Sequence, residues 1–201
     1  MAVGRAVARL RFAAASWALR SGVMVVRVAD RVLVDAARAG DVEAFEVLVR
    51  RHEGSVYRVA LRLLGSHADA QDAAQETFVR AWRGLGRFRG ESAVSTWLYR
   101  IVTNRCLNMI AAWRPPASLE REPLLVGSDP AEITEQRERF AAVARQVASL
   151  PPEQRAALVL RDFEGLSYEE VAAVLEVSVA AVKGRIHRAR LSVLGGTAAW
   201  R

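Results

Sequence analysis

The residues best suited to bind a polyanion lie close together near the C-terminus. Between Ser167 and Arg190 there are two short apolar-periodic segments, and no acid follows Glu176. The second segment carries the expected contacts to a DNA duplex: Ser178, Ala181, Lys183, Gly184, Arg185, His187, Arg188 and Arg190. Such a helix can enter a major groove, with its first turns at base edges and its later arginines against phosphates. The alternative is an ordinary amphipathic helix with a solvated basic end.

Two helix caps favour the DNA-binding interpretation. Ser167 and Glu170 have the spacing of a capping box, in which the hydroxyl and the carboxylate each accept a backbone N–H. Ser178 offers a second cap, which leaves only residues 176–178 to turn the chain. Helices joined by so short a turn cross steeply, as in a helix-turn-helix. A solvated basic face would need neither the two caps nor the lack of acids.

Two residues of this helix pair are unfavourable for its backbone. Glu176 lies in the turn, where glycine would adopt a left-handed conformation without the roughly 1 kcal/mol that a side chain costs. Gly184 lies inside the second helix, at a similar cost of about 1 kcal/mol relative to alanine. We therefore expect a strained turn and a weak second helix.

A second polar group is expected on one face of an earlier helix. Arg100, Asn104 and Asn108 follow one another at a spacing of four residues, so they share one helix face. Asn and Arg can bond base edges, and unpaired bases stack on aromatic side chains. Trp97 lies beside this stripe, but an indole at the edge of an apolar stripe is more often part of the core. We favour the core for Trp97.

The segment 69–85 has a face suited to another protein. An apolar stripe of Ala74, Phe78, Ala81, Trp82 and Leu85 is expected to point inward. The outward side chains are then Asp72, Gln75, Glu76 and Arg83. A packed inner face with a polar, partly acidic outer face is suited to docking on a protein. A solvated face, stabilised by an ion pair between Glu76 and Arg80, is the alternative.

The chain lacks the residue patterns of an enzyme. Its histidines, His52, His67 and His187, are scattered, and no nucleophile–base signature, phosphate-binding glycine loop or metal-ligand spacing is present. Cys106 is the single cysteine and lies in an apolar helical run, which indicates a buried structural thiol in a reducing cytosol. We expect no catalysis, metal, cofactor or small-molecule substrate.

Charge and hydropathy narrow the class of partner. The formal net charge is +7, which favours an anionic partner, either nucleic acid or a membrane surface. The apolar patch FAAASWAL ends just before Arg20 and is too short to span a bilayer, so we expect a cytoplasmic protein without direct membrane insertion.

Helical periodicity runs through most of the chain after Leu33, and no segment reads as a strand. We therefore predict an all-α protein of two small helical domains joined by a flexible linker. The first domain is broken at residues 64–69 and 84–92, and the linker is rich in proline. The expected divisions are 1–32, a basic extension or a mis-assigned start with Met24 as the true one; 33–112, the first domain; 113–132, the linker; 133–194, the second domain; and 195–201, a frayed tail.

Three stretches together resemble bacterial RNA polymerase sigma factors of the sigma-70 family, in the extracytoplasmic-function (ECF) group. LPPEQRAALVLRDFEGLSYEEVAAVLEVSVAAVKGRIHRAR resembles region 4, DAQDAAQETFVRAW resembles the core-polymerase-binding helix, and FRGESAVSTWLYRIVTNRCLN resembles the segment that melts the promoter and reads its minus-ten element. The order and spacing of the three make the resemblance specific. It covers residues 33–194, nearly the whole chain.

The resemblance implies a subunit that binds core RNA polymerase, recognises a bipartite promoter and helps to open it. Residues 33–112 would be region 2 and residues 133–194 region 4, which would bind the minus-thirty-five element. The loop 87–95 would capture an extruded base. The implied contacts to the minus-ten strand are Arg89, Ser95, Trp97, Arg100, Asn104, Arg105 and Asn108, and those to core polymerase are Asp72, Gln75, Glu76 and Arg83.

Promoter specificity and control are less defined by the resemblance. Ala180 and Ala181 stand where the family often has glycine and threonine, so hydroxyl contacts to the upstream element are not implied. Without an obvious autoinhibitory acidic region, we expect control from outside, by an anti-sigma factor.

The alternative function is a one-component helix-turn-helix regulator with an N-terminal ligand or dimerisation domain, which leaves the stripe of Arg100, Asn104 and Asn108 unexplained.

Overall fold

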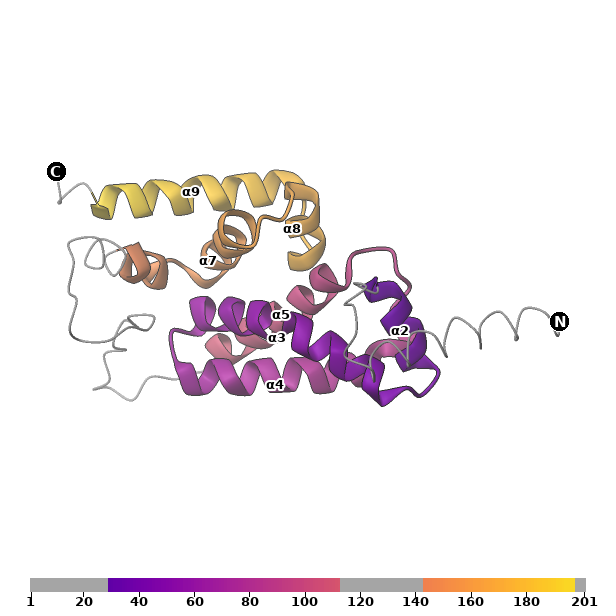
Figure 1. Ribbon diagram of the computed structural model, residues 1–201. Helices are drawn as coiled ribbons and strands as arrows, with labels where there is room; N and C mark the ends of the chain where they lie inside the picture. Colours follow the sequence, from indigo (N-terminus) through magenta and orange to yellow (C-terminus); the bar gives the residue numbers. More distant parts are fainter. Residues whose placement is uncertain (1–28, 113–142, 198–201) are drawn as a thin grey trace, which may run out of the picture.

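A computed structural model describes residues 29–112 and 143–197 of the chain (Figure 1). Helices form every regular element in these ranges, as the periodicity predicts. They are α2 (Asp30–Arg38), α3 (Val42–Leu64), α4 (His67–Gly84), the 3-10 turn η1 (Leu85–Arg87), α5 (Val94–Ala112), α7 (Pro152–Leu158), the π-helical η2 (Val159–Phe163), α8 (Tyr168–Leu175) and α9 (Val179–Thr197). Residues 143–149 are also helical. The expectations for residues 1–28 and for the linker 113–132 lie outside the described residues.

The first bundle consists of α2 to α5 and has its helix ends where short polar residues cap them. The Asp41 side chain accepts a 3.1 Å bond from the N–H of Ala44 at the start of α3. Gly65 ends α3 with a φ of 66°, and Ser66 then caps α4. The predicted break at residues 64–69 is therefore confirmed. The break before Asp41 was not predicted, although Gly40 and Asp41 are an ordinary helix-stop and helix-start pair.

The outer ends of the helical regions differ from the expected boundaries. α2 begins at Asp30, so residues 30–32 belong to the first bundle rather than to an extension. The Asp30 carboxylate holds this end, because it accepts a bond from Arg51 and its Oδ2 lies 2.7 Å from Nε2 of His52. At the other end α9 continues to Thr197, past the expected domain end at residue 194.

The second bundle consists of α7, η2, α8 and α9, and its local signals act as predicted. Prolines occupy the start of α7, where a missing N–H leaves no bond unmade. The capping box is complete: the N–H of Glu170 donates to Ser167 Oγ over 3.1 Å, and the N–H of Ser167 donates to Glu170 Oε2 over 2.8 Å. Glu176 adopts the left-handed conformation with a φ of 55°.

The two bundles contact each other, with α8 and α7 lying against α5 and η2 against α3 (Figure 1). The guanidinium of Arg155 in α7 is buried at this interface. It donates a 2.6 Å bond to the carbonyl of Leu63, near the end of α3, and a 3.1 Å bond to the carbonyl of Leu150. The interface therefore contains polar contacts as well as apolar packing.

Candidate nucleic-acid interface

The basic face of α9 is built on a short capped turn and a buried stripe. The N–H of Ala181 donates a 3.2 Å bond to Ser178 Oγ, so the second predicted cap is formed. Val182, Ile186 and Ala189 are fully buried against the rest of the second bundle. This packing leaves four of the predicted contacts exposed on the opposite arc: Lys183, His187, Arg188 and Arg190.

Acids from neighbouring elements pair with two of the predicted basic residues. Arg185 donates a 2.6 Å bond to Glu153 of α7, and its side chain is only 18% exposed. Arg190 donates bonds of 3.0 and 2.6 Å to Asp162 of η2. Neither pair can be predicted from the sequence, because the acids lie 32 and 28 residues before their partners. Among the described residues, Lys183 and Arg188 are therefore the long basic side chains of α9 that no acid holds, and Lys183 Nζ lies 5.6 Å from the centroid of the Tyr168 ring.

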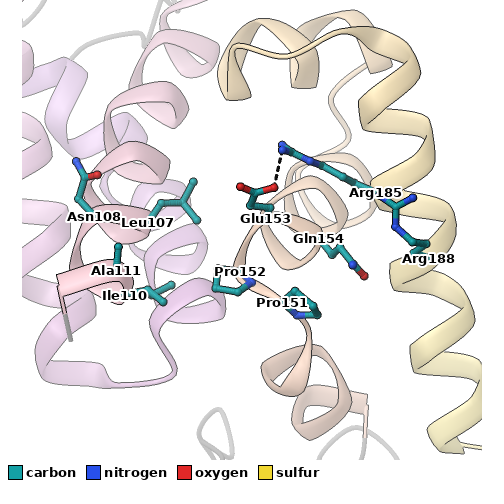
Figure 2. A pocket seen from close by; sticks show the side chains of 10 residues that line it. All are labelled: Leu107, Asn108, Ile110, Ala111, Pro151, Pro152, Glu153, Gln154, Arg185 and Arg188. Atoms are coloured by element: carbon teal, nitrogen blue, oxygen red, sulfur yellow. Dashed lines mark hydrogen bonds and ion pairs between the residues drawn. The ribbon is translucent and has the colours of Figure 1, made fainter. Parts of the chain in front are cut away.

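A cavity of about 550 Å³ lies beside this face, between the end of α5, the start of α7 and α9 (Figure 2). Figure 2 shows apolar side chains of α5 on one side and the two arginines of α9 on the other, with Glu153 directed at Arg185. Its lining residues are Leu107, Asn108, Ile110, Ala111, Pro151, Pro152, Glu153, Gln154, Arg185 and Arg188. The cavity therefore joins an apolar wall from the first bundle to a basic wall from the second.

The predicted stripe on α5 is exposed along one helix face. Arg100, Asn104 and Asn108 are all exposed, and Leu98 and Val102 are buried on the inner face. Arg100 also donates a hydrogen bond to the carboxylate of Glu176, in the turn between α8 and α9. This cross-bundle pair was not expected.

The other residues predicted to meet the minus-ten strand differ in their exposure. Trp97 is half-buried and its ring lies 4.8 Å from the ring of Phe88, which confirms that it packs on the core. Ser95 and Arg105 are also half-buried, and the buried Nε of Arg105 has no hydrogen-bond partner among the described residues. Arg89 is exposed over 83% of its side chain, and its guanidinium lies 4.0 Å from the carboxylate of Glu91.

The predicted docking face of α4 is exposed at Asp72, Gln75 and Arg83. Glu76 is half-buried and accepts a 2.7 Å bond from Arg80. This bond lowers the pKa of the Glu76 carboxyl. Burial acts in the opposite direction, and the charges of Arg80 and other arginines nearby lower the pKa further. The ion pair named in the alternative interpretation is thus formed on the outer face of α4.

The inward stripe expected for α4 is wrong at Trp82. Its indole is 40% exposed and meets the ring of Phe45 edge-on at 5.0 Å. The buried face of α4 is instead centred on small residues: Ala70, Ala73, Thr77 and Ala81. A helix turns 100° per residue, so position 82 lies beyond the edge of a face centred on these residues. Trp82 and the 42%-exposed Val79 add apolar area to the outer surface of α4.

Other kinds of site are not formed by the described residues. In residues 29–112 and 143–197, no cluster of three or more His, Cys, Asp or Glu side chains could hold a metal ion. No helix within these ranges is both long and apolar enough to cross a membrane. Cys106 is fully buried, and burial raises the pKa of its thiol to about 12.

Comparison with known proteins places these surfaces in a family. Residues 48–114 match the model of sigma-70 region 2, and residues 140–193 match that of sigma-70 region 4. The chain is 38% identical to the RNA polymerase sigma-H factor of Pseudomonas aeruginosa over 182 residues, which cover 85% of this chain and 94% of that protein. It is 39% identical to the ECF RNA polymerase sigma-E factor of Escherichia coli K12, over 85% of this chain and 95% of that protein.

A solved structure supports the same assignment. CnrH in complex with the cytosolic domain of CnrY superposes with a TM-score of 0.67 and 32% identity, over 87% of this chain and 100% of that chain. The α2–α5 bundle contains most of the region 2 match, and the α7–α9 bundle contains most of the region 4 match. The chain therefore belongs to the ECF sigma factors, the group of RNA polymerase subunits that bind the core enzyme and direct transcription initiation at promoters.

Proposed function

We propose that this sigma factor contacts its promoter through two surfaces, α9 on the upstream duplex and the α5 stripe on the minus-ten strand. The observation that carries the proposal is the capped helix pair, because Ser167 and Ser178 fix α9 with its basic arc exposed. In this assignment residues 33–112, with α2 from Asp30, serve as region 2 and residues 133–194 as region 4. Residues 113–132 connect them across the polymerase.

At the upstream element the contacts are mainly to phosphates. Lys183 and Arg188 are exposed on α9, and each phosphate that they neutralise releases counterions from the DNA. Arg185 and Arg190 are held by Glu153 and by an acid of η2, so their direction is set before DNA arrives. Base readout is left to the first turn, near Ser178 and Ala181, where few polar side chains are available.

At the minus-ten element the stripe of Arg100, Asn104 and Asn108 reads the melted strand. Amide and guanidinium groups can bond the base edges and the backbone of unpaired nucleotides. The exposed Arg89 in the loop before α5 supplies a further backbone contact. Ser95 and Arg105 act from the flanks, and Trp97 supports the loop through its packing on Phe88.

The outer face of α4 docks on core polymerase. Asp72, Gln75, Glu76 and Arg83 supply the polar contacts, and the exposed indole of Trp82 adds an aromatic anchor of the kind enriched at protein interfaces. Initiation then depends on binding energy rather than on bond chemistry, and the protein acts where the polymerase is, in the cytoplasm.

Control by an anti-sigma factor is part of the proposal. CnrH, the 32%-identical protein of known structure, was solved with the cytosolic domain of CnrY. The cavity between α5, α7 and α9 has an apolar wall and a basic wall, which suits an acidic amphipathic segment of such a partner. Release of that partner would uncover Arg188 of α9 and Asn108 of the α5 stripe, which line the cavity.

In vitro transcription tests the proposed function directly. The purified chain is added to core polymerase and fragmented genomic DNA, and the 5′ ends of the transcripts are sequenced. We expect starts that share two conserved elements upstream, and their loss when Arg100, Asn104 and Asn108 are all replaced by alanine. A one-component regulator would yield no new starts, which would overturn the proposal.

A further inference from the structure

The interface between the two bundles contains a buried carboxylate that promoter recognition does not use. Glu164 follows η2 in region 4, and its side chain is only 6% exposed. It accepts a 2.9 Å bond from Arg62 of α3 and a 3.0 Å bond from the hydroxyl of Tyr99 in α5. One acid of region 4 therefore joins two helices of region 2.

The surroundings of Glu164 make this contact a strong one. An ionised carboxylate is costly to bury without a partner, and here both of its oxygens are bonded. The Arg62 guanidinium also lies 4.7 Å from the ring centroid of Phe163, the neighbour of Glu164. Burial raises the pKa of Tyr99, and the charge of Glu164 adds to the rise, so the phenol remains a proton donor. Separation of the bundles would break all these contacts together.

A second acid of region 4 occupies a residue that we assign to DNA. Glu176, in the left-handed turn before α9, accepts a hydrogen bond from Arg100, the first residue of the α5 stripe. The two side chains are 58% and 52% exposed, so this ion pair is well solvated and weak. A carboxylate and a phosphate both bond a guanidinium as anions, so the carboxylate of Glu176 can compete with a phosphate of the melted strand for Arg100.

We propose that Glu164 and Glu176 hold the free sigma factor in a closed state in which Arg100 is withheld from the minus-ten strand. We call the contacts of Glu164 the lock, because they keep the two bundles together. Glu176 is the anion that pairs with Arg100 when DNA is absent. The inference rests on the proposed function for the part that concerns Arg100, but not for the closure itself. Control thus begins within the chain, whereas the sequence analysis expected it only from outside.

This closure cannot be predicted from the sequence, because it depends on single acids scattered through region 4. Glu164 and Arg62 are 102 residues apart, and Glu176 and Arg100 are 76 residues apart. An autoinhibitory segment would be visible as a run of acids, but two isolated glutamates become inhibitory only when the fold places them opposite basic side chains. The turn at Glu176 also has a role in this closure, since glycine there would offer no carboxylate to Arg100.

The closure can be measured in the full-length chain by energy transfer between dyes on the two bundles. Gln71 on α4 and Ser192 on α9 are exposed and can be replaced by cysteine, while the buried Cys106 stays unlabelled. The free protein is compared with the double variant Glu164→Gln/Glu176→Gln. We expect the ratio of open to closed molecules to rise at least tenfold in the double variant, and an unchanged transfer distribution in a folded variant would overturn the proposal.

Matched variants separate closure from a general loss of charge or of folding. Glu43→Gln/Glu169→Gln removes two exposed acids outside the interface contacts described above and is expected to keep the wild-type distribution. A similar opening in this control would overturn the specific role of the two interface acids. If circular dichroism shows that the double variant is unfolded, Tyr99→Phe removes one hydroxyl from the lock and should still shift molecules toward the open state. The absence of any shift in a folded Tyr99→Phe variant would contradict the lock.

A second measurement separates failure of the lock from failure of the proposed function. The probe is a single-stranded oligonucleotide with the non-template minus-ten sequence mapped by the transcription assay. Since the apparent dissociation constant scales inversely with the competent fraction, opening should tighten binding of this probe by the factor by which the open fraction rises. Opening without tighter binding would overturn the withholding of Arg100. Adding Arg100→Ala to the open variant tests the proposed function itself, because unchanged probe affinity would then refute the DNA role of Arg100 whatever the energy transfer shows.

Discussion

Asp162 and Arg190 form an ion pair with two hydrogen bonds, which joins η2 to α9. The bonds are 3.0 and 2.6 Å long, and the hydrogen bond from Arg190 to Asp162 raises the pKa of the guanidinium. About half of the Arg190 side chain is exposed, so it can still meet a phosphate. Two of its guanidinium nitrogens, however, already bond the Asp162 carboxylate. The acid therefore weakens one of the predicted DNA contacts.

Replacement of Asp162 by Asn should strengthen duplex binding. It removes a negative charge beside the phosphates and frees Arg190, so affinity should rise about two- to fivefold, equivalent to roughly 0.5–1 kcal/mol. The slope of log K against log salt should steepen by up to about 0.9, as for one added phosphate contact. Fluorescence anisotropy of a labelled promoter duplex at several salt concentrations measures both. Glu169→Gln is the control for loss of charge, and a wild-type slope for Asp162→Asn would show that Arg190 does not contact phosphate.

Arg188→Ala should have the opposite effect. Arg188 is exposed on the basic arc of α9 that we assign to DNA, so its loss should weaken binding to all duplex sequences alike. The salt slope should fall by about 0.9, which corresponds to one phosphate contact. Arg145→Ala, which removes an exposed arginine from another helix, should leave the slope unchanged. A sequence-dependent loss would assign Arg188 to base readout instead.

Asp72→Ala combined with Glu76→Ala should weaken the complex with core polymerase. Both side chains lie on the outer face of α4, and their loss should lower the affinity at least tenfold, about 1.4 kcal/mol, without loss of helical content. Competition against a labelled sigma factor for core enzyme gives the affinity, and far-ultraviolet circular dichroism gives the helicity. Glu46→Ala/Glu53→Ala removes two exposed acids from α3 as a control. Normal assembly of the α4 variant would refute the docking face.

Two substitutions at Glu176 separate the strain of its backbone from its ion pair. Both Glu176→Gly and Glu176→Gln lose the exposed pair with Arg100, worth about 0–1 kcal/mol. Only glycine relieves the left-handed conformation, so the glycine variant should be more stable than the glutamine variant by about 1 kcal/mol. Urea unfolding with a shared m-value measures the difference. Equal midpoints would mean that the turn at φ 55° carries no strain.

The buried thiol predicts a dependence of stability on pH. Burial raises the Cys106 pKa to about 12 in the folded chain, so the unfolded chain loses this proton first. The contribution of the protonated thiol to the free energy of unfolding is fully present below about pH 9. It is lost as pH rises toward 12, by at most about 1.4 kcal/mol per pH unit. The difference between the unfolding profiles of the wild-type chain and Cys106→Ala isolates this effect. A difference that does not change above pH 9 would contradict it.

The sequence predicted best the features that are local along the chain. The capping box at Ser167, the cap at Ser178 and the prolines before α7 each act within a few residues, so their chemistry is visible without the fold. Residue spacing likewise placed Arg100, Asn104 and Asn108 on one exposed helix face. Trp82 was misplaced because hydrophobicity alone cannot show that a helix packs closely through its alanines.

Contacts between distant segments could not be predicted. The partners of Arg185, Arg190 and Arg100 lie tens of residues away and are acids of ordinary type. Nothing in their spacing distinguishes Glu153 or Asp162 from acids on a solvated surface. Their roles depend on how the second bundle folds and on how it meets the first.

The buried guanidinium of Arg155 also affects the order in which the chain can fold during its synthesis. The last carbonyls of α3 lack partners within the helix, and that of Leu63 receives its donor from Arg155, 92 residues later. Until the ribosome has released α7, this end of α3 must be hydrated by water. The longest helix of the first bundle therefore acquires its final contact only when most of the chain has left the exit tunnel.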